Sequence, residues 1–181
     1  IPSGGVPIGY IIAKELDVAF DIAVVRKIQI PWNTEAGFGA VTWEGDVVLN
    51  DRLVEGLKLS SEVMGQCIGR AQEVVQARIK KFRGERPFPN VKGRTVIVVD
   101  DGLASGFTML AAVRSIRRRS PKGITVAVPT ASNTAVELLI DEVDELVCPN
   151  IRGGPMFAVA DAYMEWHDLS DEEVMGFLSK A

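Results

Sequence analysis

The sequence is poor in the residues on which disulfide-rich and metal-binding domains depend. Its 181 residues include two cysteines, Cys67 and Cys148, and one histidine, His167. Two cysteines without CxxC spacing argue against a disulfide framework and against a zinc knuckle. A single histidine excludes a His-rich metal site and disfavours a Ser-His-Asp triad. We therefore expect a soluble protein of a reducing compartment, the cytoplasm.

Long apolar runs are missing too. No stretch approaches the roughly 20 residues that a membrane span requires. The opening IPSGGVPIG is broken by glycine and proline, unlike a signal peptide. We expect no membrane attachment. The chain starts at Ile1 without methionine, and Ile1-Pro2 is typical of the end of a strand, so residues upstream are expected.

A surplus of positive charge is also absent. Lys and Arg number 20 against 24 Asp and Glu, a formal net charge of −4. A nonspecific nucleic-acid coat needs the opposite balance, so nucleic acid is not the expected partner. The charge is uneven, with basic residues gathered at positions 70–94 and acidic ones at 161–173. When basic residues gather on one face of a helix, that face is usually solvated surface.

Short β-branched runs alternate with helical patterns through most of the chain. The runs at residues 20–25, 96–99, 124–128 and 145–148 are apolar on both faces, as is typical of parallel strands covered by helices. Helical patterns occupy residues 6–16, 108–119 and 133–140. This alternation predicts an α/β fold with a doubly wound, mostly parallel sheet. The length predicts a single domain, residues 1–181.

Residues 28–90 interrupt the alternation and are predicted to form a hood or flap. Residues 40–43 and 47–49 flank Glu44-Gly45-Asp46, which favours a β-hairpin with a glycine turn. A long amphipathic helix follows, with apolar residues at three- and four-residue steps between Met64 and Phe82. The hairpin region could be a mobile flap that excludes water or an ordinary packed hairpin. Near the carboxyl end, Ser170 and Glu173 have the spacing of a capping box.

The segment at residues 95–109, TVIVVDDGLASGFTM, carries the strongest chemical signal. A strand that opens onto a helix N-terminus is where α/β sheets bind ligands, and the free helix N–H groups attract phosphate. Small residues let the backbone approach that phosphate, and Ser105 and Thr108 add hydroxyl groups. Asp100 and Asp101 could accept hydrogen bonds from a sugar diol and hold Mg²⁺. The alternative is that they merely cap the turn and pair with a neighbouring base.

Other nucleotide and hydrolase motifs are missing. The chain contains neither GxxxxGK[ST] nor GxGxxG, so a P-loop and a dinucleotide fingerprint are not supported. The run GLASG does not match GxSxG, so a nucleophile elbow is not supported either.

The run VIVVDDGLASGFT resembles the phosphoribosyl pyrophosphate (PRPP) motif of type I phosphoribosyltransferases. IPSGG at residues 1–5, ahead of a helix, resembles their pyrophosphate loop, and VRKI at residues 25–28 follows an expected strand. The longer run VRKIQIPWNTEAGFGAV and the later AVPTAS resemble a bacterial and archaeal subgroup of stand-alone, poorly characterised phosphoribosyltransferases. The resemblance covers essentially the whole chain.

The resemblance implies a PRPP-binding site with three parts. Asp100 and Asp101 would hold the ribose hydroxyls, and also Mg²⁺ directly, through water or through PRPP. The 5-phosphate would lie in the loop after them, and the pyrophosphate near the amino terminus. The implied binding residues are Ser3, Gly4, Gly5, Arg26, Lys27, Asp100, Asp101, Gly102, Leu103, Ala104, Ser105, Gly106 and Thr108. Asp100, Asp101 and Lys27 are the implied catalytic residues. The subgroup's pyrophosphate loop usually begins with arginine, where this chain has Ser3.

The implied function is Mg²⁺-dependent transfer of the 5-phosphoribosyl group from PRPP to a nitrogenous acceptor, a nucleobase, with release of pyrophosphate. The resemblance also implies a homodimer and a place in nucleotide metabolism. Phe157, Tyr163 and Trp166 follow the last strand, where type I enzymes often recognise the base; they could equally be core residues. A non-catalytic PRPP or nucleotide sensor that contacts RNA through residues 70–83 remains the alternative.

Overall fold

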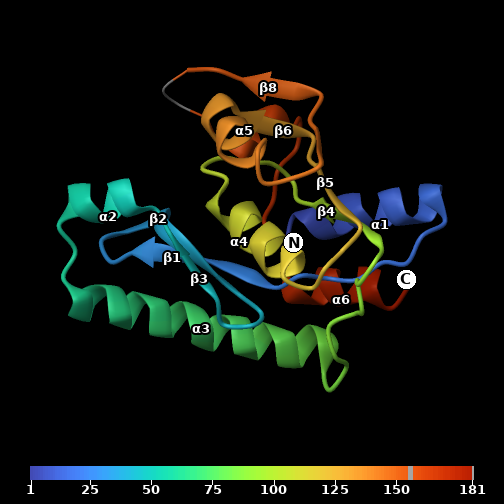
Figure 1. Ribbon diagram of the computed structural model, residues 1–181, viewed down its shortest axis with the longest axis horizontal. Coiled ribbons are helices and arrows are strands. Elements are labelled where there is room, and N and C mark those ends of the chain that lie inside the picture. Colours follow the sequence, from blue (N-terminus) through green and yellow to red (C-terminus); the bar gives the residue numbers. More distant parts are fainter. Residues whose placement is uncertain (155–156, 181) are drawn as a thin grey trace.

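The core of the protein is a parallel sheet connected by helices (Figure 1). The computed structural model describes residues 1–154 and 157–180. Strands β4 (Thr95–Val99), β5 (Gly123–Ala127) and β7 (Glu145–Val147) run parallel in the order β4-β5-β7. Helices α4 (Phe107–Arg117) and α5 (Asn133–Leu139) form the crossovers that parallel strands require. The predicted α/β fold with its parallel sheet is confirmed.

A second parallel pair braces the loop that follows β4. Strand β6 (Thr130–Ser132) pairs with β8 (Asn150–Arg152), and Leu103 forms an isolated bridge to Ala131. The Leu103 N–H donates to the Thr130 carbonyl at 3.0 Å, and the Ser132 N–H donates to the Leu103 carbonyl at 2.9 Å. The loop is therefore held at its centre by backbone hydrogen bonds.

The strand predicted at residues 20–25 is wrong. The strand of this region is β1 (Val25–Ile30), and residues 18–24 are not part of a strand. Ile22 and Val24 are nonetheless almost completely buried. An apolar run indicates that a segment is buried, but not that it forms a strand. Here the burial comes from side-chain packing, without pairing to a neighbouring strand.

Strand β1 belongs to an antiparallel sheet with β2 (Asn33–Thr42) and β3 (Val47–Leu49). The predicted hairpin between β2 and β3 is confirmed, with Gly45 at a φ of 85° in its turn. The inner face of the sheet is packed, because Phe38 and Val41 are fully buried and form one core with Val75 of α3 (Ser61–Arg83). Trp32, in the turn between β1 and β2, is exposed, and the role of this region as a hood or flap stays a prediction.

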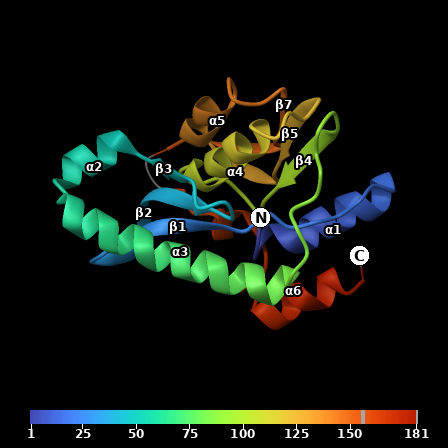
Figure 2. The same cartoon turned by 60° about the horizontal axis from the view of Figure 1, so that its bottom comes forward.

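Three further α-helices and the short 3-10 helix η1 (Val159–Ala162) complete the described part of the fold. The short α2 (Asp51–Leu57), which sequence patterns did not predict, is capped by Asn50 and leads into α3. Helix α1 (Gly5–Leu16) packs on α6 (Asp171–Leu178) through Tyr10 and Phe177, whose ring centroids are 5.5 Å apart. The predicted capping box of Ser170 and Glu173 starts α6, and α6 lies along the carboxyl half of α3 (Figure 2). No helix formed by the described residues combines the length and apolar character needed to cross a bilayer.

Candidate active site

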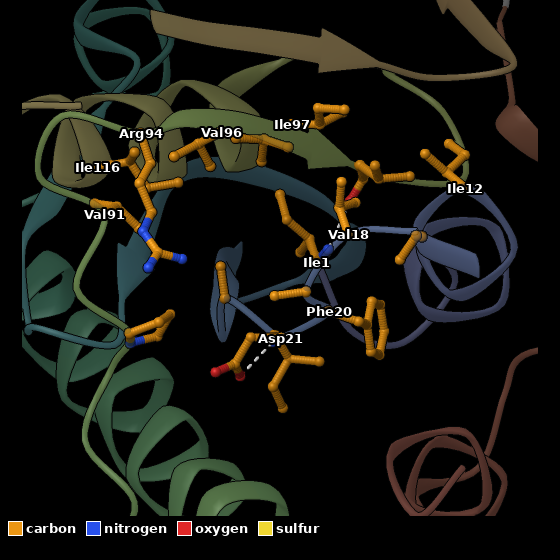
Figure 3. A pocket seen from close by; sticks show the side chains of 18 of the residues that line it. Ile1, Ile12, Val18, Phe20, Asp21, Val91, Arg94, Val96, Ile97 and Ile116 are labelled. Carbon is orange, nitrogen blue, oxygen red and sulfur yellow. Dashed lines mark hydrogen bonds between the residues drawn. The ribbon is translucent and has the colours of Figure 1, made fainter. Parts of the chain in front are cut away.

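Two cavities of similar size lie on either side of the amino terminus. One, of about 560 Å³, separates residues 18–23 from β4 and is lined mainly by apolar side chains such as Ile12, Val96 and Ile97 (Figure 3). Its lining also includes Asp21, which is held in an ion pair by Arg83. Arg94 and Asn90 also belong to the lining, but apolar groups dominate it, so this cavity suits a phosphorylated ligand less well than the second cavity.

The other cavity, of about 570 Å³, opens at the carboxyl end of β4. It is lined by every predicted binding residue except Gly5, namely Ser3, Gly4, Arg26, Lys27, Asp100, Asp101, Gly102, Leu103, Ala104, Ser105, Gly106 and Thr108. These residues come from the amino-terminal loop, from β1 and from the β4–α4 loop, which lie far apart in the sequence. The fold thus brings the three predicted groups into one cavity.

Two neighbouring acids, Asp100 and Asp101, line this cavity. Burial raises the pKa of Asp100 to about 7, and the neighbouring Asp101 adds to that rise. Burial also raises the pKa of Asp101. The Asp101 N–H donates to the Asp100 carboxylate at 3.0 Å. A partly buried acid pair with raised pKa values is typical of a functional site, and a cation or hydroxyl donors would favour its charged form.

The amino-terminal loop touches the acid pair directly, and this contact explains its glycines. A Cβ atom at Gly4 would lie 1.7 Å from Oδ2 of Asp101, and one at Gly5 would lie 2.7 Å from Cα of Asp100. Only glycine leaves room for this approach. Gly5 therefore packs directly against the backbone of Asp100. The peptide bond between Pro2 and Ser3 in the same loop is cis.

The loop after the acid pair forms a cradle at the start of α4. Gly106, with a φ of 80°, precedes the helix, and no side chain caps its first turn. The first N–H groups of a helix have no partner within it, so they can bind an anion here. Leu103 lines the cavity, but its side chain is buried and its N–H donates to the Thr130 carbonyl. It positions the cradle and has no N–H left to offer a phosphate.

A third cation lies in this cavity besides Arg26 and Lys27. Arg78 of α3 lines the cavity, and its Nη2 donates to Oγ of Ser3 at 3.5 Å. From the sequence, Arg78 is one of the basic residues gathered at positions 70–94 and is not predicted to bind substrate. A signal was present, because Ala71, Val75, Arg78 and Phe82 follow one another at steps of four, three and four residues on the buried face of α3.

The opposite wall of the cavity comes from the carboxyl-terminal region. Trp166, His167, Asp168 and Leu169 line it together with Val159. Tyr163 packs edge-on against Trp166 and donates its hydroxyl to the Asp101 carbonyl at 2.6 Å. Burial and the nearby carboxylates raise the pKa of Tyr163 to about 12, so this hydroxyl remains a donor at neutral pH. Phe157 does not line the cavity.

The acid pair suits a divalent cation that is shared with a substrate. Within the described part of the chain, no three His, Cys, Asp or Glu side chains come together as a metal site. Mg²⁺ is commonly held by one or two carboxylates, with water and substrate phosphate oxygens completing its shell. Asp100 and Asp101 fit that donor set.

Comparisons with known proteins point to the same family as the sequence motifs. The family model described as phosphoribosyl transferase domain matches residues 1–160. Two Mycobacterium tuberculosis proteins, named "Putative phosphoribosyl transferase" MT0597 (strain CDC 1551) and Rv0571c (strain H37Rv), are each 36% identical over 182 residues. The alignment covers all of this chain and 41% of theirs, so the chain spans about two fifths of the length of these curated relatives. The crystal structure of TT1426 from Thermus thermophilus superposes with a TM-score of 0.76 at 32% identity, covering 99% of this chain and 84% of that one.

Proposed function

The chain belongs to the phosphoribosyl transferase domain family, and from that premise we propose that it transfers the 5-phosphoribosyl group of PRPP to a nitrogenous acceptor and releases pyrophosphate. One observation carries the proposal. A single cavity is lined by the acid pair, by the start of α4, which no side chain caps, and by the amino-terminal loop with its neighbouring cations. This cavity offers matching groups for a diol, a monophosphate and a pyrophosphate.

In this proposal the protein acts mainly by holding both ends of PRPP. Asp100 and Asp101 accept hydrogen bonds from the two ribose hydroxyls. The backbone N–H groups at the start of α4 bind the 5-phosphate, and Thr108 adds a hydroxyl. The amino-terminal loop binds the pyrophosphate. With both ends fixed, the anomeric carbon between them is oriented for attack.

The reaction exchanges one bond at the anomeric carbon for another. The bond to the pyrophosphate oxygen breaks, the acceptor nitrogen forms the new bond and releases its proton to solvent, and the departing pyrophosphate takes the electron pair. By analogy with glycosyl transfer, positive charge develops on the sugar at the transition state. Arg26 and Lys27 stabilise the negative charge that gathers on the leaving group. When bound, Mg²⁺ would add positive charge at the same oxygens.

A nucleobase is the proposed class of acceptor. Trp166 lines the cavity and is 42% exposed, so part of its ring remains free to contact a ligand. Aromatic faces stack on flat heterocycles. Tyr163 holds the Trp166 ring edge-on, with centroids 5.1 Å apart, and thereby orients it.

The test is pyrophosphate release from PRPP and Mg²⁺ across a panel of purines and pyrimidines. We expect turnover with at least one base. We expect the double variant Asp100→Asn/Asp101→Asn to stay folded and to lose about 100-fold or more of that activity, because two charge-assisted contacts disappear. Asp141→Asn, an exposed change outside the cavity, is the matched control. Near-normal turnover by the double variant would show that the site is misassigned.

Dependence on Mg²⁺ and a homodimeric state are proposed with the activity. Chelation by EDTA should stop turnover, and sedimentation should give twice the chain mass.

The RNA-contacting sensor finds little support in the basic helix. Lys81 pairs with Asp171 and Glu172 at 3.1 and 3.0 Å, and Arg83 is buried, so these two cations of the helix are not open to a nucleic acid.

A further inference from the structure

We infer that Arg78 of α3 binds the pyrophosphate end of the substrate and supplies the cation that the amino-terminal loop lacks at Ser3. This inference rests on the proposed function and assigns a binding role to a residue outside the recognised motifs.

Geometry places Arg78 at the loop. Its Nη2 atom lies 3.5 Å from Oγ of Ser3, and its side chain is only 22% exposed although it is charged. It lines the same cavity as Gly4 and Arg26. The short Ser3 side chain leaves space in which the longer arginine can reach the loop from the helix.

Charge at this wall favours an anion. Burial lowers the pKa of Arg26, and the positive charge of Arg78 lowers it further, so these two guanidinium groups repel each other in the ligand-free protein. Asp171 offsets Arg78 with an ion pair at 3.4 Å, but Lys81 contacts the same carboxylate at 3.1 Å. Asp171 is therefore shared between Arg78 and Lys81, while Glu172 also pairs with Lys81 at 3.0 Å. A pyrophosphate between Arg26 and Arg78 would relieve their repulsion and accept hydrogen bonds from both.

Helix α6 keeps Arg78 in place. Asp171 is the first residue of α6, directly after the Ser170 cap. The capped helix end fixes the carboxylate, and the carboxylate orients the guanidinium. A cation carried by a buried helix face is held more firmly than one on a glycine-rich loop.

The experiment compares Arg78→Gln with Arg70→Gln, which removes an exposed arginine two turns earlier on the same helix and outside the cavity. Calorimetry with Mg²⁺ measures pyrophosphate, PRPP and a ribonucleoside 5′-monophosphate. We expect Arg78→Gln to weaken pyrophosphate and PRPP about 10- to 100-fold, the loss of a charge-assisted contact, and to leave the monophosphate within about twofold. Arg70→Gln should bind all three like the wild type. The double variant Ser3→Arg/Arg78→Gln should regain at least part of the lost pyrophosphate affinity.

The outcomes separate this inference from the proposal beneath it. Unchanged pyrophosphate binding by Arg78→Gln would overturn the inference and leave the proposed function standing. Equal losses for pyrophosphate and monophosphate would also overturn it, because they would indicate a structural role. A wild-type protein that binds neither PRPP nor pyrophosphate would overturn both.

Discussion

At the scale of one residue, the burial of Asp100 in the candidate site lowers the stability of the folded protein. Asp100 is partly buried in the wall of the cavity, and Gly5 packs against its backbone. Burial raises its pKa to about 7 from an ordinary value of 3.8. Between these two values the unfolded chain has released a proton that the folded protein still holds. Stability therefore falls as the pH rises from about 4 to 7, and it stays reduced above 7.

We predict that Asp100→Asn melts at a higher temperature than the wild type at pH 8, in the absence of ligand and metal. The amide needs no ionisation, so its burial carries no such pH-dependent cost. The difference should shrink towards pH 4, where the wild-type carboxyl is protonated in the folded protein. Thermal unfolding measured from pH 4 to 8 provides the check.

Asp144 is the matched control, because its shift has the opposite sign. The Ile124 N–H at 2.7 Å and Arg117 at 3.0 Å lower the pKa of this carboxyl. Its stabilisation is present above the ordinary pKa and is lost as the pH falls. Asp144→Asn should therefore lower the melting temperature at pH 8. If both variants shifted in the same direction at pH 8, the burial of Asp100 would not be the controlling factor.

Helix α3 performs three tasks at the scale of an element. Its buried stripe covers the antiparallel sheet, Arg78 faces the cavity, and Arg83 ties its end to the segment before β1. The Arg83 side chain is 4% exposed, pairs with Asp21 and donates to the Ile22 carbonyl at 3.2 Å. It also lies over the Phe88 ring, 5.5 Å from its centroid.

We expect Arg83→Met to lose about 2–3 kcal/mol of unfolding free energy. The change leaves Asp21 and the Ile22 carbonyl without their partner, and breaking a buried pair costs more than the pair contributes. Asp21 is 32% exposed, so water offsets part of the loss. Arg70→Met, an exposed change on the same helix, should stay within about 0.5 kcal/mol of the wild type. Urea unfolding measures both, and equal losses would contradict the role given to Arg83.

The candidate site is a property of the whole molecule. Its walls come from the amino-terminal loop, β1, α3, the β4–α4 loop and the stretch before α6. None of these segments forms a binding site alone. A ligand that fills the cavity contacts all of them, and it therefore stabilises the folded chain against global unfolding.

PRPP with Mg²⁺ at about 100 times its dissociation constant should add about 2.7 kcal/mol of stability. For a chain of this length that corresponds to a rise of roughly 5–10 °C in melting temperature. Asp100→Asn/Asp101→Asn should show little rise under the same conditions, and EDTA should reduce the wild-type rise. Differential scanning fluorimetry makes the comparison. An equal rise in the wild type and the double variant would place the ligand elsewhere.

The sequence alone determined the local features, because their causes are local. Apolar strand runs, helical periodicity, the turn at Gly45 and the capping box of Ser170 each depend on neighbouring residues. The β4–α4 segment was recognisable for the same reason, since its acids, glycines and helix start are contiguous.

Tertiary structure decided which segments meet. It alone showed that residues 18–24 pack without strand pairing, that the Leu103 N–H is taken up by Thr130, and that Arg78 reaches Ser3 across 75 residues of chain. A sequence pattern reports that a position is buried or charged. The partner is set by long-range packing, because burial and charge can be satisfied by any segment that the completed fold places alongside.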